Sequence, residues 1–242
     1  MKMLRRAVYC ERLKARGTLI WPAFLLIPVI PVLLGTGNYL ANLDLLESRW
    51  YSLWTQVTLF FATFFFAPLI GTYCAFLWRY ENFGGNRNTL FSRPIPVGII
   101  YLAKLVLVWE LTVLTMIWFL GLFLLAGRWA GLSLPVPGQI WLWMARGIPG
   151  AFVIAALQYL AASLIPNFSL PIIAGVLGGV TGLLGANGKV GIFWPYSQML
   201  LGMNSNQAED VLGAKGPIFF GICILYLVFL VGAGIKLVKF RR

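Results

Sequence analysis

The chain of 242 residues contains no histidine, and only seven residues are acidic and three are cysteine. Without histidine, neither a zinc centre of the usual kind nor a Cys/His dyad can be built, so we expect no metal site. Metal-dependent and CAAX-type membrane proteases also need histidine. An aspartyl protease needs aspartates in the membrane, and Asp44 and Asp210 both fall in predicted loops. We therefore expect no catalytic residues and a protein that is not an enzyme.

Charge of either sign is scarce, at 11% of residues, whereas 60% are hydrophobic and the mean hydropathy is +0.84. A soluble domain carries about a quarter charged residues. Apolar runs of the ~20 residues needed to cross a bilayer recur along the whole chain. We therefore expect an all-α polytopic membrane protein with residues 1–242 forming one membrane domain. A long basic head precedes the first run and no small-residue cleavage site follows it, which argues against a cleavable signal peptide.

Helix-breaking residues divide the apolar sequence into six predicted transmembrane helices. Their ranges are Thr18–Gly35, Leu53–Trp78, Gly98–Ala126, Ile148–Ile165, Phe168–Ala186 and Pro217–Val238. Only Pro166 and Asn167 separate the fourth and fifth, which predicts a tight helical hairpin. Residues 139–146 either extend the fourth span or lie at the membrane interface. The stretch 187–216 is expected to fold partly back onto the membrane.

Basic residues predict the orientation of the bundle. Fourteen of the nineteen lysines and arginines lie in the two tails, in the connection between the second and third spans and at the start of the third. Such an excess marks the cytoplasmic side, so we expect both termini in the cytoplasm. The net charge of +12 then fits this orientation and anionic membrane lipid better than nucleic acid.

The N-terminal segment has the pattern of a helix lying in the headgroup region. Met1, Leu4 and Val8 share one helical side, and basic residues surround the rest. Alternatively, the basic residues only hold the N-terminus on the cytoplasmic side of the membrane, and the two interpretations are compatible.

The connection after the second span predicts a short helical element. Gly84 and Gly85 interrupt the outgoing helix, and Asn88 or Thr89 can cap a helical turn. Pro94 then separates that turn from the third span. Such an element is a candidate docking site for a soluble partner, although most loops of this kind are mere connections.

This segment resembles the cytoplasmic signature of type-2 ABC exporter permeases. The matching residues are Glu81, Thr89, Leu90, Pro94 and Lys104. Upstream, the sequence CERLKARGT resembles the start of the bacitracin- and lantibiotic-immunity branch of that family. There the matching residues are Glu11, Leu13, Lys14, Arg16 and Thr18.

The resemblance implies a permease subunit in a bacterial cell membrane. It would pair with a second permease, identical or homologous, and with two copies of a separate ABC ATPase that binds ATP and Mg²⁺. The chain itself would hold no cofactor; its one GK dipeptide, at 188–189, lacks the other P-loop residues. The substrate would be an amphipathic antimicrobial peptide, expelled for self-immunity. The coupling residues would be Arg79, Glu81, Arg87, Asn88, Thr89, Leu90 and Pro94, with Arg79, Glu81 and Arg87 nearest the ATPase.

Glu110 lies within the third predicted span, at a position we expect near mid-membrane. An acid there costs about 2.5–3.5 kcal/mol, so it should face protein or water. Gln158 in the fourth span is its candidate hydrogen-bond partner. The pair predicts either a contact for a cationic substrate or a purely structural interhelical bond.

Small residues mark the fifth predicted span, where Gly175, Gly179 and Gly182 permit close helix packing. The contact could lie within the subunit or between subunits. Two other functions also stay open. One is a permease for a different ABC substrate, such as a polysaccharide, lipid or drug. The other is a scaffold or secondary transporter that uses no nucleotide.

Overall fold

The computed structural model describes residues 2–82, 86, 94–188, 190–207 and 209–240, and regular structure in these ranges is helical throughout. The first half comprises α1 (Lys2–Ala15), α2 (Ile20–Leu26), α3 (Val29–Ala41), α4 (Trp50–Phe60), the π-helix η1 (Phe61–Phe65), α5 (Phe66–Asn82) and α7 (Val97–Trp129). The second half comprises α8 (Gly138–Leu164), α9 (Ser169–Ala186), η2 (Gly191–Phe193), α10 (Ser197–Gly202), η3 (Gly213–Lys215) and α11 (Gly216–Phe240), where η2 and η3 are 3-10 helices.

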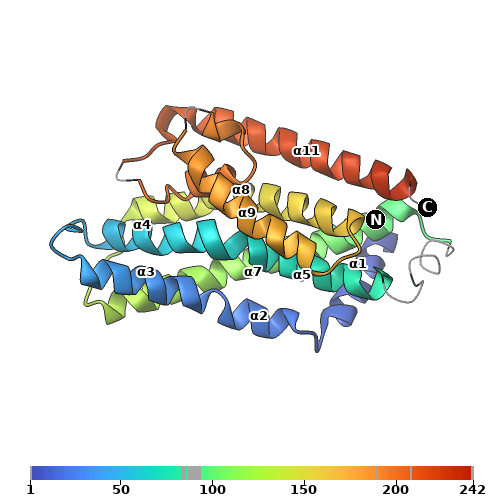
Figure 1. The fold of residues 1–242 in the computed structure, drawn as a ribbon, viewed down its shortest axis with the longest axis horizontal. Helices are drawn as coiled ribbons and strands as arrows, with labels where there is room; N and C mark the ends of the chain where they lie inside the picture. Colours follow the sequence, from blue (N-terminus) through green and yellow to red (C-terminus); the bar gives the residue numbers. More distant parts are fainter. Residues whose placement is uncertain (1, 83–85, 87–93, 189, 208, 241–242) are drawn as a thin grey trace.

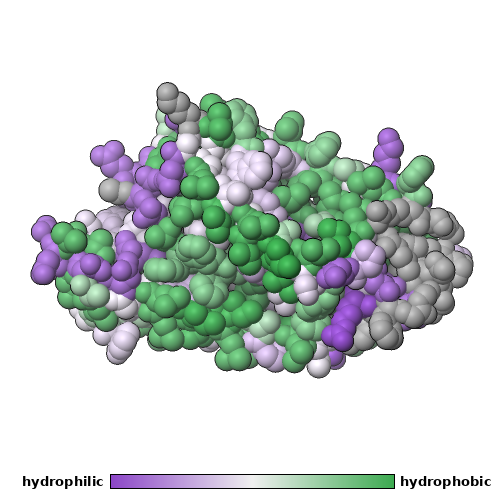
Figure 2. Space-filling model, in the orientation of Figure 1, coloured by the Kyte–Doolittle hydropathy of each residue, from purple (hydrophilic) through white to green (hydrophobic). Residues whose placement is uncertain are grey.

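Six of these segments are long and apolar enough to span a membrane, which confirms the predicted fold class. They are Ile20–Ala41, Trp50–Arg79, Val97–Trp129, Gly138–Leu164, Ser169–Ala186 and Gly213–Phe240. A broad hydrophobic surface lies between polar residues at the two ends of the bundle (Figure 2). The chain is thus a multi-pass membrane protein.

Both chain termini lie at one end of the bundle, which we call the terminal end; the opposite end is the loop end (Figure 1). Helix α1 lies across the terminal end and packs on α7. Its buried residues, Val8, Glu11 and Ala15, follow one helical side. The predicted N-terminal helix is therefore present, and its place at a membrane interface stays a prediction.

Proline explains two irregularities in the first two spans. Pro28, which has no backbone N–H, separates α2 from α3, so the first span consists of two helices. The second of these helices ends at Ala41, whereas the predicted span ended at Gly35. In the second span, the π-helical turn η1 directly precedes the turn that contains Pro68. A proline ring crowds the carbonyl four residues earlier, here Phe64, and a wider turn relieves that contact.

The fourth span begins earlier than predicted, because α8 starts at Gly138. Residues 139–146 therefore belong to this helix, which resolves the alternative in favour of the span. Four residues, 165–168, join α8 to α9, so the predicted tight hairpin is confirmed.

Helix α9 packs against α5 and η1 through the glycines of its inner side. A Cβ atom on Gly175 would stand 2.7 Å from the carbonyl group of Ala67, and one on Gly179 would overlap the carbonyl oxygen of Thr63. Gly182 meets the backbone of Tyr196 in the same way. These three glycines therefore pack within the subunit.

The stretch 187–216 folds back into the bundle at the loop end. All six residues of α10 are buried, and the helix packs against α8 and α9. Arg146 of α8 holds Asp210 of this stretch in an ion pair of 2.7 Å. Part of this stretch thus packs inside the bundle, and its return onto the membrane stays a prediction.

Candidate functional site

Lys104 of α7 lies at the centre of a buried ionic cluster near the terminal end. Its side chain is 1% exposed, and the Nζ atom donates to Glu11 Oε2 at 2.7 Å and to the Leu77 carbonyl oxygen at 3.1 Å. Glu81 Oε1 lies 3.1 Å from the same nitrogen. An ammonium group has three protons, and here three acceptors surround it, so its burial carries no unpaired donor.

Lys14 of α1 completes the ionic cluster, which we define as Glu11, Lys14, Glu81 and Lys104. Its Nζ atom donates to Glu11 Oε1 at 2.9 Å and to Glu81 Oε1 at 2.8 Å. Each carboxylate is thus bridged by both lysines, and the four formal charges cancel. The cluster joins α1, α5 and α7, three helices that are distant in sequence.

The ionic cluster shifts the pKa values of Glu81 and Lys14. Burial raises the pKa of Glu81, but Lys104 and Lys14 lower it by more, so the net pKa lies below the ordinary value of 4.5. Burial lowers the pKa of Lys14, yet Glu81 and Glu11 raise it to a net value above 10.5. Both groups are therefore charged at neutral pH.

The cluster brings together residues from both sequence motifs. Glu11 and Lys14 come from the N-terminal motif, whereas Glu81 and Lys104 come from the motif that runs from the end of α5 into α7. Glu81 is only 5% exposed, so it anchors α5 inside the subunit and presents little surface to a partner. A contact between Glu81 and an ATPase stays a prediction.

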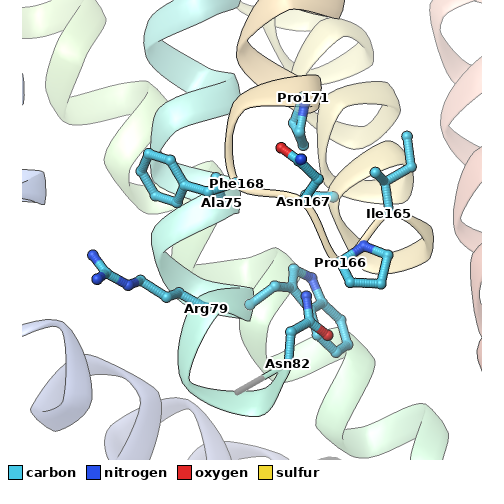
Figure 3. A pocket seen from close by; sticks show the side chains of 10 residues that line it. Ala75, Arg79, Asn82, Ile165, Pro166, Asn167, Phe168 and Pro171 are labelled. Carbon is cyan, nitrogen blue, oxygen red and sulfur yellow. The ribbon is translucent and has the colours of Figure 1, made fainter. Parts of the chain in front are cut away.

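Arg79 lies two residues before Glu81 on α5 and is exposed at the terminal end. Its guanidinium carbon stands 5.8 Å from the centre of the Phe168 ring. Figure 3 shows both residues beside a pocket of about 200 Å³ between the end of α5 and the turn from α8 to α9. Asn82 and Asn167 also line this pocket, so the second and fifth spans meet there.

Four predicted coupling residues, Arg87, Asn88, Thr89 and Leu90, lie outside the described residues, as does most of the predicted coupling helix. Pro94 is described and is exposed in a bend just before α7. In the N-terminal motif, Leu13 and Arg16 are exposed. This motif therefore divides into residues that build the cluster and residues that face outward.

Glu110 pairs with Arg12 of α1, a partner that sequence analysis missed. The guanidinium Nε donates to Oε2 at 2.9 Å and Nη2 donates to Oε1 at 2.5 Å. The predicted hydrogen bond between Glu110 and Gln158 is wrong. Gln158 is fully buried and instead shares a hydrogen bond of 3.1 Å with the Tyr196 hydroxyl group. A role for either residue in substrate passage stays a prediction.

Glu110 lies on the side of Trp118 that faces the terminal end. Trp118 Nε1 donates to the Leu25 carbonyl oxygen, so these residues lie at one level. Glu110 precedes Trp118 by eight residues, or about 12 Å of helix, and its side chain reaches Arg12 of α1. The depth of Glu110 in a membrane stays a prediction.

The length of α7 makes a position of Glu110 near the edge of the membrane possible. The helix has 33 residues, about 50 Å at 1.5 Å per residue, against a hydrocarbon core of ~30 Å. The 20 residues from Glu110 to Trp129 suffice to cross the core. The charged side chain reaches the basic face of α1, and at such a position it would avoid most of the cost of a buried acid.

Comparison with protein families decides the broader class. The sequence profile described as ABC-2 family transporter protein matches residues 7–182. The chain belongs to the ABC-2 transporter family. This ABC-2 chain is thus a membrane permease subunit of the kind found in ABC exporters, and such subunits typically work with an ABC ATPase. The matched region contains all four residues of the ionic cluster.

Comparisons with curated proteins and with solved structures gave no match.

The sequence of this ABC-2 chain predicts no metal site. Within the ranges that the structure describes, no three His, Cys, Asp or Glu side chains are grouped closely enough to hold a metal ion. The carboxylates of the site are instead bound by lysine and arginine.

Proposed function

We propose that the ionic cluster transmits the movement of a partner ATPase to the transmembrane helices of an exporter. The observation that carries this proposal is the burial of Lys104 between Glu11 and Glu81. Helices α5 and α7 are the two that flank residues 83–96, the expected docking segment. Because the cluster ties both helices to α1, a force on that segment moves three helices together.

A rigid transmission element needs contacts that do not stretch under load. Two lysines that each bridge two carboxylates give four charge-assisted contacts within 3.1 Å, and such hydrogen bonds are about twice as strong as neutral ones. Removing one charge leaves each of its partners with a single ionic contact and leaves the buried charges unbalanced. The cluster thus favours movement of α1, α5 and α7 as one body.

The partners in this proposal are two copies of an ABC ATPase and a second permease, identical or homologous. ATP and Mg²⁺ would bind in the ATPase. The terminal end would face the cytoplasm of a bacterium, because it carries both tails and most of the basic residues. Arg79 is exposed beside the expected docking segment and would offer a positive charge to an acidic surface of the ATPase.

The substrate we propose is an amphipathic antimicrobial peptide of the lantibiotic type, removed from the producer's own membrane. The support is the N-terminal motif, of which Glu11 and Lys14 are placed in the cluster. Glu110 already pairs with Arg12, so a cationic peptide would meet this ion pair and not a lone carboxylate. A polysaccharide, lipid or drug would use the same transmission element.

Photo-crosslinking tests the docking assignment. A photoreactive amino acid replaces Asn86, which is exposed in the expected docking segment, and the matched control replaces Glu47, which is exposed at the loop end. We expect a crosslinked protein with Walker motifs, identified by mass spectrometry, from position 86 and none from position 47. The same crosslink from both positions, or from neither, would refute the assignment.

A further inference from the structure

An open groove lies beside the Arg12–Glu110 ion pair, on the outward side of α7 and α8. Its volume is about 500 Å³, and its lining is almost entirely apolar apart from the Glu110 carboxylate. The lining residues, which define the groove, are Val106, Trp109, Glu110, Val113, Leu114 and Phe152. The rings of Trp109 and Phe152 lie 5.5 Å apart and bridge the two helices.

The groove runs along α7 away from α1. At one end, Glu110 is bound by Arg12 of α1, a helix outside the six candidate spans. Val113 and Leu114 continue along α7 toward the loop end. A lipid in the groove would therefore place its headgroup at the ion pair and an acyl chain beside Val113 and Leu114.

The ion pair retains unused binding capacity. Glu110 engages the Nε proton and one Nη2 proton of Arg12, whereas a guanidinium group has five N–H donors. The side chain of Arg12 is 55% exposed and that of Glu110 is 31% exposed. Both charges can thus receive a ligand without separating from each other.

Charges around the groove indicate the chemistry of its occupant. Six basic residues lie along α1 and just beyond its end, which favours an anionic group such as a phosphate. The acidic residue of α1, Glu11, is buried against Lys104. Glu110 is therefore the carboxylate that remains for a cationic group of the same ligand.

We propose that this groove is a binding site for a phospholipid with a primary-amine headgroup, such as phosphatidylethanolamine. The phosphate accepts hydrogen bonds from Arg12, the ammonium group donates to Glu110, and one acyl chain lies along Val113 and Leu114. This site does not depend on the exporter's substrate. It would anchor α1 to the membrane surface through the same ion pair that fixes it to α7.

Native mass spectrometry of the full-length protein tests the proposal. Delipidated protein is titrated with phosphatidylethanolamine, phosphatidylglycerol and phosphatidylcholine of identical acyl chains. We expect the wild-type protein to prefer phosphatidylethanolamine. Glu110→Gln should lower that binding about tenfold, the effect of losing one charge-assisted hydrogen bond, and should leave phosphatidylglycerol bound. Arg12→Gln should lower the binding of both lipids, whereas Arg16→Gln, an exposed arginine just after α1, should lower neither.

A second pair of variants tests the groove independently of charge. Leu114→Trp fills it, whereas Ile117→Trp adds the same bulk at an exposed position of α7 that does not line it. We expect only the former to reduce lipid binding. Equal binding of the three lipids, equal effects of the two tryptophan variants, or a protein dimer that excludes lipid from the groove would each overturn the proposal.

Discussion

At the scale of single residues, Lys104 is the most deeply buried member of the ionic cluster. Replacing it by methionine removes three contacts from an almost fully buried site and leaves Glu11 and Glu81 with Lys14 alone. We expect Lys104→Met to cost about 3 kcal/mol, which lowers the unfolding temperature by roughly 6–12 °C. Thermal unfolding in detergent measures this. The exposed Lys236→Met at the same end is the matched control, and an equal shift in both variants would contradict the assignment.

Glu81 makes the stability depend on pH in the acidic range. Its folded-state pKa lies below 4.5, so its contribution is fully present above 4.5 and is lost as pH falls through the lower, folded value. We expect the unfolding temperature to fall steeply below pH 4.5 in the wild-type protein and less steeply in Glu81→Gln. Unfolding temperatures measured between pH 7 and pH 3 test this; parallel curves would show that Glu81 does not contribute.

The residues of the cluster were predicted from the sequence, but their contacts were not. Lys14 and Glu81 are 67 positions apart, and Glu11 and Lys104 are 93 apart. No periodicity links such positions, so the two motifs were interpreted as separate features. Arg12 was missed because a basic tail predicts orientation without indicating which cation meets an acid. The ion pair could have been sought by starting from the few acidic residues, since each charged acid in such an apolar chain needs a partner.

At the scale of helices, the contact of α9 with η1 depends on glycine. A side chain at position 179 would overlap the Thr63 carbonyl oxygen, so Gly179→Ala must push α9 outward. We expect a loss of about 1–3 kcal/mol of stability, measured as a lower unfolding temperature. Gly221→Ala in α11, where a Cβ atom meets open space, should be neutral. Similar stability of the two variants would indicate that α9 does not pack as described.

The six spanning helices could be predicted from the sequence, whereas the neighbours of a given residue on a helix could not. Apolar runs located all six spans, since a bilayer demands ~20 such residues. Ile100, Leu105 and Val108 in the first turns of α7 are apolar and buried, and α7 packs against α1. Hydropathy cannot separate residues that face lipid from residues that face another helix. The contact of Glu110 with Arg12 of α1 could therefore not be predicted from the hydropathy of the span.

At the scale of the whole molecule, the native cysteines report the orientation. Cys10 is exposed on α1, whereas Cys74 and Cys223 are buried. With the terminal end in the cytoplasm, a membrane-impermeant maleimide should label Cys10 in inverted vesicles and not in intact cells. Glu47→Cys at the loop end should show the reverse pattern. Labelling of Cys10 in intact cells would contradict the proposed orientation.

The central claim is that the ionic cluster transmits motion, and Lys14 offers the most direct test because its side chain is 42% exposed and its loss should be tolerated by the fold. The measurement is the ATP hydrolysis rate of the partner ATPase, alone and in complex with each purified permease variant. The account predicts that Lys14→Met still assembles but loses the permease-dependent change in rate. Lys14→Arg should retain it, as should Lys2→Met on the exposed part of α1. A Lys14→Met complex that hydrolyses ATP like the Lys2→Met complex would contradict the account.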